Sequence, residues 1–333
     1  MLQSIKRSIR FALIGTGIIF FSLLTVFYFP NIKVADTSQS IFVPTGTSFA
    51  KLKEILEPHL RSEITFSLAA KAKRFDTPRI GHFVLKPSMG NQQIINALRS
   101  GNTPIQVVFN NQQTIADLSG RVAEQLELDS LSLIKEIESP HFMESVNLNR
   151  EELLSLFLPN SYEMYWNISA AEFCQRMQRE NNLFWNESRE SKRKRLNMSR
   201  AEVITLAAIV NEESRKVDER PRVAGVYLNR LRRGMKLQAD PTLVYAMKRQ
   251  ANDFDLVVRR VLYKDLEINS PYNTYKYRGL PPGPITMPDI SSVDAVLNAE
   301  SHSYLFFVVD PKNPGYHLFA SNYNEHLANR KVY

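Results

Sequence analysis

The stretch from Ser199 to Ser214, which reads SRAEVITLAAIVNEES, decides how the fold is interpreted. Ser199 and Glu202 stand at the spacing of a capping box, so a helix is predicted to begin at Ser199. The residues that follow are apolar on nearly every side of such a helix, whereas a surface helix has a polar face. We therefore predict a helix that is buried among other elements.

Glu213 lies at the end of this helix and is the leading candidate for chemistry. At about 100° per residue, its side chain falls within about 40° of Leu206 and Ile209, on an apolar stripe. It also lies at the negative end of the helix dipole, where a carboxylate is disfavoured. Both effects predict a raised pKa for Glu213, which suits a general acid that works near neutral pH. The alternative is a helix end that extends into solvent. Glu212 points about 100° away and is the weaker candidate.

Polar and aromatic residues cluster on the predicted loops downstream of this helix. A second helix is predicted over residues 223–231, and the prolines of segment 279–285 stiffen a further loop. Amides, hydroxyls and tyrosines on such loops offer hydrogen bonds and flat apolar faces to sugar rings. The other interpretation is that they tie the loops together. The residues predicted to bind substrate are Asn229, Gln238, Asp240, Thr242, Tyr272, Asn273, Thr274 and Tyr275.

The composition excludes several classes of protein. Of the 333 residues, 44% are hydrophobic, which is enough for a core and excludes a disordered or collagen-like chain. Cys174 is the only cysteine, so a disulfide scaffold is excluded as well. Lys and Arg number 42 against 34 Asp and Glu, a net charge of +8, which suggests a polyanionic partner such as nucleic acid or a membrane surface.

The N-terminus holds a candidate transmembrane helix. Residues 11–29 carry no charge, and a helix of that length spans about 28 Å, which is one bilayer core. Basic residues precede it, so the positive-inside rule places residues 1–10 in the cytoplasm and the rest of the chain outside. A cleaved signal peptide is the alternative. Such peptides have small residues at alternate positions before the cut, but Lys33 lies two residues before the only nearby alanine, Ala35.

This topology changes the interpretation of the positive charge. Outside the cytoplasm, nucleic acid is the wrong partner. The basic run at 192–195 follows Glu187 and Glu190 and has no aromatic residues interleaved as stacking platforms. We therefore predict a solvated helix end there, with no nucleic-acid site.

The chain beyond the membrane helix is predicted to be α+β. Within residues 36–104, strands at 41–43 and 82–85, a helix capped by Ser48 and a second helix predict a small α+β module. The remainder, residues 105–333, is mainly helical in pattern and is predicted to form a mixed α+β domain around the buried helix.

Five strings carry a resemblance to a known family. They are AAIVNEE at 207–213, RPRVAGVYLNRL at 220–231, QADPT at 238–242, SPYNTY at 270–275 and GLPPGPI at 279–285. In this order they resemble the endolytic murein transglycosylases of the MltG, or YceG-like, family, and the resemblance covers essentially the whole chain. It implies an N-terminal membrane anchor, a LysM-like module at 36–104 and a catalytic domain at 105–333.

The resemblance assigns the catalytic role to Glu213, the last acidic residue of the first string. Three positions depart from the family pattern. Asn211 stands where the family often has an acidic residue or Gln, which leaves Glu213 as the sole catalytic carboxylate. Glu212 replaces a basic residue and places a like charge beside Glu213. Asn160 stands where the family has an aspartate, so a role for that acid does not carry over.

The reaction that the resemblance implies is lytic transglycosylation. Glu213 protonates the glycosidic oxygen between N-acetylmuramic acid and N-acetylglucosamine. It then takes the proton of the muramic acid C6 hydroxyl, which attacks C1 and gives a 1,6-anhydro sugar. One carboxylate fits this route better than hydrolysis, which usually needs a flanking pair. No cofactor or metal is expected, since His302, His317 and His326 do not pair at ligand spacing.

The same resemblance implies a location and partners. The chain is expected to be a single-pass protein of the inner (cell) membrane, with a periplasmic catalytic domain that terminates glycan elongation. The expected partners are peptidoglycan strands, membrane lipid around residues 11–29 and peptidoglycan synthases. Two alternatives stay open: a muramidase-type hydrolase that uses Glu213 with a second acid such as Asp240, and a non-catalytic peptidoglycan-binding scaffold.

Overall fold

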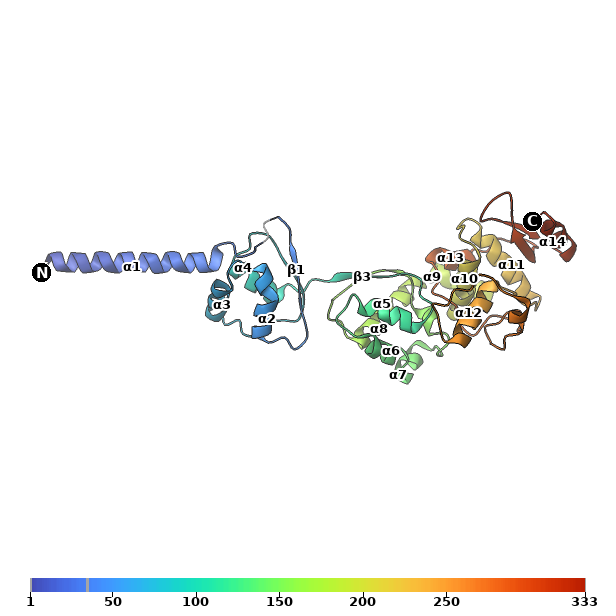
Figure 1. Ribbon diagram of the computed structural model, residues 1–333, viewed down its shortest axis with the longest axis horizontal. Helices are drawn as coiled ribbons and strands as arrows, with labels where there is room; N and C mark the ends of the chain where they lie inside the picture. Colours follow the sequence, from blue (N-terminus) through green and yellow to red (C-terminus); the bar gives the residue numbers. More distant parts are fainter. Residues whose placement is uncertain (1, 34–35, 333) are drawn as a thin grey trace. The chain divides into compact units, whose positions relative to one another are not determined.

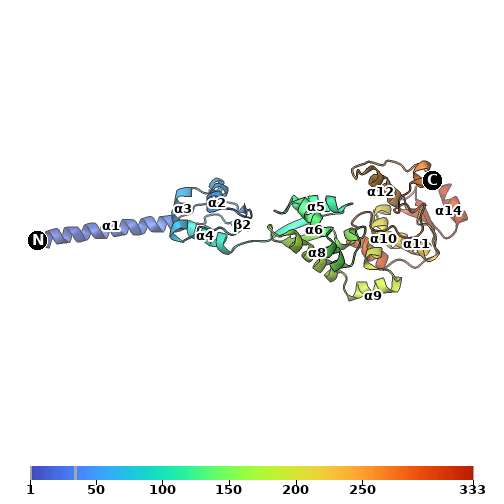
Figure 2. The same cartoon turned by 90° about the horizontal axis from the view of Figure 1, so that it is seen from below.

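The computed structural model describes residues 2–33 and 36–332, so Ala35 lies outside the described residues. The chain divides into two compact units. The first unit comprises Met1–Val107, Gln125–Glu127 and Tyr162–Ile168, and the second comprises Val108–Glu124, Leu128–Ser161 and Ser169–Tyr333. Figure 1 and Figure 2 show a mixed α+β protein with a long N-terminal helix, which confirms the predicted fold class at this level.

The N-terminal helix α1 (Leu2–Tyr28) is largely apolar, and most of its described side chains are exposed. Ile18 and Phe21, for example, are 62% and 69% exposed. Its segment Ile9–Tyr28 is long and apolar enough to cross a membrane, a test that a signal sequence near the N-terminus also passes. The helix begins earlier than the predicted residue 11, because the basic segment before it holds no proline or glycine to stop it.

The first unit also contains a small α+β arrangement. Its elements are β1 (Gln39–Val43), α2 (Phe49–Leu56), the 3-10 helix η1 (Glu57–His59), α3 (Glu63–Ala72), β2 (Gly81–Leu85) and α4 (Asn91–Ser100). The strands pair antiparallel with Ile41 opposite Phe83, and Ser48 caps α2, as predicted. Helix α3 was not predicted, because Ile64 and Leu68 are 75% and 54% exposed and blur its apolar face.

The second unit is mainly helical, as predicted. Its helices are α5 (Ile115–Ala123), α6 (Ser130–Ile137), α7 (Pro140–Val146), η2 (Leu153–Leu156), α8 (Ala170–Phe184), α9 (Glu187–Leu196), α10 (Arg200–Glu213), α11 (Arg220–Arg232), α12 (Asp240–Ala251), η3 (Tyr263–Glu267), α13 (Ile290–Leu297) and α14 (Tyr323–Arg330). Strands β5 (Phe306–Val309) and β6 (His317–Ala320) pair antiparallel. Strands β3 (Ile105–Phe109) and β4 (Asn160–Met164) form another two-stranded sheet, and the division between the units falls within them.

Helix α9 carries the basic run at residues 192–195 in its last turns. None of its side chains is buried, and the Arg193 guanidinium lies 2.7 Å from the Glu190 carboxylate. The prediction of a solvated helix end is therefore confirmed.

Helix α10 is the centre of the second unit, with α11, α12 and α13 packed around it (Figure 1). The predicted capping box is present: the Glu202 N–H donates to Ser199 Oγ at 3.0 Å, and the Ser199 N–H donates to Glu202 Oε2 at 2.6 Å. Nine of its 14 residues are buried. Each large aliphatic side chain stabilises a fold by about 1.5–3 kcal/mol when buried. This packing therefore holds α10, and the residues at its C-terminal end, in a fixed position within the second unit.

Candidate active site

The carboxyl group of Glu213, a half-buried residue, lies at the C-terminal end of α10. Its Oε1 accepts a hydrogen bond of 2.7 Å from the hydroxyl of Tyr227, a residue of α11 that is only 1% exposed. The carboxyl faces a cavity of about 300 Å³. The cavity is lined by Gln113, Glu212, Glu213, Asp240, Pro241, Val244, Tyr245, Lys248 and Ile285. Glu213 is thus accessible from the cavity while protein surrounds it on its other sides.

The surroundings of Glu213 keep its carboxyl protonated to an unusually high pH. Burial raises its pKa from the ordinary 4.5 to about 7, because a charged carboxylate loses its hydration there. The hydrogen bond from Tyr227 lowers this pKa and the negative charge of Asp240 raises it, while His317 and Arg230 lower it. A carboxyl group with such a pKa can both give and take a proton near neutral pH.

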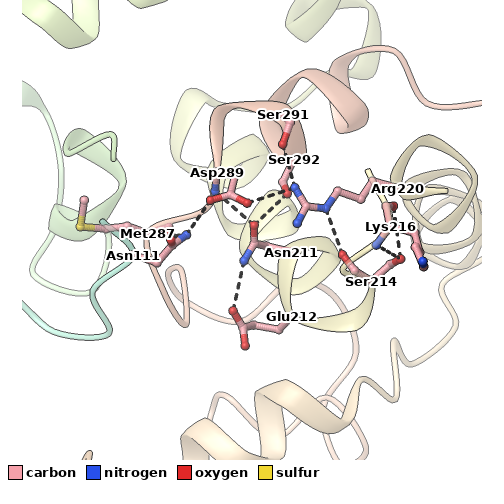
Figure 3. A network of polar contacts seen from close by, with 10 residues as sticks. All are labelled: Asn111, Asn211, Glu212, Ser214, Lys216, Arg220, Met287, Asp289, Ser291 and Ser292. Atoms are coloured by element: carbon pink, nitrogen blue, oxygen red, sulfur yellow. Dashed lines mark hydrogen bonds and ion pairs between the residues drawn. The ribbon is translucent and has the colours of Figure 1, made fainter. Parts of the chain in front are cut away.

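Asn211 anchors the last turn of α10 to the segment before α13 (Figure 3). Its Oδ1 accepts hydrogen bonds from the Asp289 N–H at 3.2 Å and from the Ser292 hydroxyl at 3.0 Å. Its Nδ2 donates to Glu212 Oε1 at 3.2 Å. Asn211 therefore ties the last turn of α10 to the segment before α13 and contacts the side chain of Glu212.

Arg220 fixes the residue that follows Glu213 (Figure 3). Its Nε donates to the Ser214 carbonyl at 3.0 Å. Its Nη1 donates to Asp289 Oδ2 at 3.2 Å and to the Ser291 hydroxyl at 2.7 Å. Because Arg220 is only 5% exposed, these charge-assisted bonds hold the end of α10 rigidly.

A buried carboxylate on the other side connects the same helix end to β6. Glu219 accepts hydrogen bonds from the Ser214 hydroxyl at 3.1 Å, from the His317 N–H at 2.8 Å and from His317 Nδ1 at 2.8 Å. Glu219 is 4% exposed. This arrangement brings the His317 ring near Glu213, from a part of the chain about a hundred residues away in sequence.

Sequence reasoning did not identify Tyr227, Glu219 or His317 as parts of a site around Glu213. Tyr227 stands within the second family-like string, and that string was the one signal that pointed to it. The Glu219–His317 contact joins residues 98 positions apart, and no local pattern encodes such a pair.

Three of the predicted substrate-binding residues lie at or beside the Glu213 cavity. Asp240, the first residue of α12, lines the cavity and accepts a hydrogen bond from the Tyr275 hydroxyl. Gln238 and Tyr275 line an adjoining cavity of about 550 Å³, which shares Asp240 with the first. All three therefore line one of two cavities that meet at Asp240.

Other predicted substrate-binding residues make hydrogen bonds within the protein. Thr274 Oγ1 accepts from the Ala239 N–H at 3.0 Å and bonds to Thr242 Oγ1 at 2.7 Å, and both threonines are buried. The amide of fully buried Asn273 donates to the carbonyls of Leu266 and Ile268, at 2.9 Å each. These bonds hold the loop of residues 266–276 together and fasten it to the start of α12.

Asn229 and Tyr272 also make internal contacts, and Tyr272 in addition lines a cavity that shares Tyr245 with the Glu213 cavity. The amide of Asn229 donates to the carbonyls of His302 at 2.8 Å and Tyr304 at 2.9 Å. Tyr272 is 1% exposed, and its ring packs 4.7 Å from that of Tyr245. Both residues support the walls of the site, as the interpretation that such residues tie loops together expects.

A third cavity adjoins the Glu213 cavity. It has a volume of about 620 Å³ and shares Gln113 and Tyr245 with the Glu213 cavity. The Glu213 cavity thus adjoins two larger cavities. Across residues 2–33 and 36–332, no three His, Cys, Asp or Glu side chains gather as a metal-binding group.

Comparison with known proteins gives a consistent set of similarities. A sequence model of the YceG-like family matches residues 41–332. A Bacillus subtilis protein named endolytic murein transglycosylase is 29% identical over 323 residues, which cover 91% of this chain and 87% of that protein. A protein of the same name from Streptococcus pneumoniae R6 is 25% identical, over 87% of this chain but 57% of its own length. The crystal structure of a yceG-like protein from Listeria monocytogenes matches with a TM-score of 0.58 and 28% identity, over 87% of this chain and 98% of that one.

Proposed function

The chain belongs to the YceG-like family, and from this premise we propose that it is an endolytic murein transglycosylase. It is a lyase that cleaves the bond between N-acetylmuramic acid and N-acetylglucosamine within peptidoglycan strands. Its similarity to the Bacillus subtilis protein of that name extends over most of both chains. The reaction leaves a 1,6-anhydro-N-acetylmuramic acid end, and it terminates the strand at that point.

The observation that carries this proposal is the enclosed carboxyl of Glu213, whose pKa is raised to about 7. Protonated Glu213 gives its proton to the glycosidic oxygen as the bond from that oxygen to C1 of the muramic acid breaks. The resulting carboxylate then takes the proton of the C6 hydroxyl, whose oxygen forms the new bond to C1. The proton returns to Glu213 and no water is consumed, so one carboxyl serves as acid and then as base.

The neighbours of Glu213 prepare it for these steps. Tyr227 donates to Oε1, which leaves Oε2 to carry the proton that faces the cavity. The hydrogen bonds of Arg220 and Asn211 hold the end of α10 in place. A general acid that is fixed in this way loses little free energy to reorientation when the glycosidic oxygen arrives.

The arrangement of cavities supports cleavage within a strand. An enzyme that cuts internal bonds must accommodate sugars on both sides of the scissile bond. The Glu213 cavity adjoins the cavity of about 550 Å³ at Asp240 and the cavity of about 620 Å³ at Gln113 and Tyr245. A strand long enough to occupy all three has several sugars bound around Glu213, which suits cleavage of an internal bond.

One observation favours a second candidate, a muramidase-type hydrolase. Asp240 lines the same cavity as Glu213, and its charge acts on the Glu213 carboxyl. In that reaction Asp240 supplies the second acid group, and a water attacks C1 in place of the C6 hydroxyl. The two reactions differ in product: hydrolysis leaves a reducing end, whereas transglycosylation leaves an anhydro end.

The organisation of the chain is part of the proposal. Residues 11–29 anchor it in the membrane lipid, with residues 1–10 in the cytoplasm and the remainder in the periplasm. Residues 36–104 form a LysM-like module and residues 105–333 the catalytic domain, with the buried helix α10 carrying the catalytic glutamate. Peptidoglycan synthases are the expected protein partners of an enzyme that acts on strands beside the membrane.

The test is to digest sacculi with the full chain in detergent and to identify the new glycan ends by mass spectrometry. We expect 1,6-anhydro ends, and we expect the same ends, formed more slowly, from Asp240→Asn. New reducing ends that disappear in Asp240→Asn would replace the lyase with the hydrolase. No new ends of either kind would leave only the binding scaffold.

A further inference from the structure

The cavity of about 550 Å³ beside the site carries more positive charge than its walls balance. Arg230, Arg260 and Arg330 line it, whereas Asp240 is the only carboxylate in its described lining. That carboxylate already accepts a hydrogen bond from a tyrosine hydroxyl. Such a cavity attracts an anionic group.

The arginines have no acidic partner within the described part of the chain. No ion pair there includes Arg230, Arg260 or Arg330. Arg230 is 8% exposed and donates to the carbonyls of Leu305 at 2.6 Å and Leu237 at 2.7 Å, so its charge is held in place without being neutralised. The other two arginines are exposed and free to turn toward a ligand.

His326 also lines this cavity. In the described structure its Nδ1 atom is buried and has no hydrogen-bond partner. An unsatisfied buried polar group costs about 1–3 kcal/mol, and the described protein offsets none of this cost. The ring is held in place by stacking on Phe306, with centroids 5.2 Å apart and planes at 26°.

Two exposed tyrosines also line the cavity of about 550 Å³. Tyr263 is 91% exposed and Tyr323 is 57% exposed, and both line it. Exposed tyrosines with one polar end suit a ligand that is partly apolar and partly hydrogen bonding. A peptide that bears carboxylates has this character, whereas a bare sugar ring carries no negative charge.

We propose that this cavity binds the carboxylate-bearing substituent of the muramic acid beside the scissile bond. The inference rests on the proposed function, because a strand that passes Glu213 enters this cavity at Asp240. Muramic acid carries a lactyl group, to which a peptide with free carboxylates is attached. Where the peptide has been removed, the lactyl group itself ends in a carboxylate, so one chemistry has two possible sources.

The experiment compares two double variants of the full chain that lose the same charge. Arg260→Gln with Arg330→Gln removes the two exposed arginines of the cavity. Arg259→Gln with Lys331→Gln is the matched control, since these neighbours do not line the cavity. The cleavage activity of each double variant is measured on peptide-bearing strands and on the same strands after an amidase has removed the peptides. The affinity of each double variant for both kinds of strand is also measured with Glu213→Gln added, so that no cleavage occurs.

We expect KM and Kd for peptide-bearing strands to rise about 5- to 30-fold in the cavity variant and less than about 2-fold in the control, with kcat unchanged. If the difference vanishes on peptide-free strands, the peptide carboxylates are the ligand; if it persists, the lactyl carboxylate is. Equal changes in the two double variants on both substrates would overturn the proposal. The affinities measured in the Glu213→Gln background test this inference even if the wild-type protein cleaves no strands. An inactive wild type would count against the proposed function and not against the anionic subsite.

Discussion

Two cavities lie at the opposite ends of α10, and they differ in size and in chemistry. The larger, of about 740 Å³, is lined by Ala201 and Thr205 from the first half of the helix, together with Leu228 of α11. The smaller, of about 300 Å³, is lined by Glu213 at the last turn. Volume alone would select the larger cavity as the site.

The carboxylates of the two cavities explain why the smaller one is the better candidate. In the larger cavity, Glu300 is 42% exposed and lies 2.9 Å from the Arg222 guanidinium, and Glu202 is engaged in the helix cap. Glu213 forms no ion pair within residues 2–33 and 36–332, and its pKa is raised to about 7. A titratable group in such an environment marks a functional site more reliably than cavity size does.

Removal of the Glu213 carboxyl is expected to have the largest effect on activity. Glu213→Gln keeps the shape of the side chain but cannot donate the proton, so we expect the rate of glycan cleavage to fall about 10²- to 10⁴-fold. Release of anhydro ends from sacculi measures the loss. The matched control is Glu212→Gln, which changes the exposed neighbouring carboxylate and should keep most of the activity. Equal losses in the two variants would contradict the assignment.

The same substitution should stabilise the protein at alkaline pH. The pKa of Glu213 is higher in the folded state than the ordinary 4.5, so its contribution to stability is complete below pH 4.5 and is lost as pH rises through 7. Gln avoids this loss. We expect the free energy of unfolding of Glu213→Gln to exceed that of wild type by about 1–3 kcal/mol at pH 8, and by little at pH 4. Denaturant unfolding at the two pH values tests this, and a gain that did not depend on pH would count against a buried titrating carboxyl.

Tyr227→Phe removes a hydroxyl beside Glu213, so it changes the environment of the Glu213 carboxyl without removing it. The hydrogen bond from Tyr227 lowers the pKa of Glu213, so Tyr227→Phe raises it and moves the alkaline limb of kcat/KM to higher pH. We also expect kcat to fall about 10-fold, because the acid loses its orientation. A pH–rate profile separates the two effects. A lower rate with no shift of the limb would assign Tyr227 a purely structural role.

Asp240→Asn should move the alkaline limb of kcat/KM to lower pH. The charge of Asp240 raises the pKa of Glu213, so its removal lowers that pKa and leaves less of the acid protonated at pH 7. We expect kcat/KM at pH 7 to fall roughly threefold and to recover at lower pH. A loss of activity at every pH would instead indicate that Asp240 takes part in the reaction.

The smallest effect is expected at the larger cavity. Glu300→Gln breaks an exposed ion pair, which contributes at most about 1 kcal/mol to stability. Cleavage should therefore change less than about 2-fold, measured in the sacculus assay. A large loss there would mean that the larger cavity belongs to the active site.

The sequence predicted α10 and the place of Glu213 because both depend on local signals. The capping box marks the start of the helix, and the apolar run that surrounds Leu206 requires burial. The sequence did not predict helix α3, because Ile64 is apolar but exposed. The apolar residues of this helix therefore do not lie on a single face.

The remainder of the site depends on contacts between distant residues. Thr274 and Asn273 were predicted to bind sugar from their polar character, but tertiary packing uses that polarity to satisfy buried backbone groups. The bond from Tyr227 to Glu213 joins two helices, and the bonds from His317 to Glu219 join a strand to a helix end. Periodicity within one segment carries no information about such pairs.

The most direct test of the central claim is to titrate the Glu213 carboxyl itself. The full chain, labelled with ¹³C at the glutamate side-chain carboxyls, is followed by NMR from pH 3 to pH 10, beside a Glu213→Gln sample. We predict one carboxyl resonance that titrates near pH 7 and is missing from the variant. If every glutamate of the wild-type protein titrated near its ordinary value, and the variant lost one of those, Glu213 would not be the poised acid on which this mechanism depends.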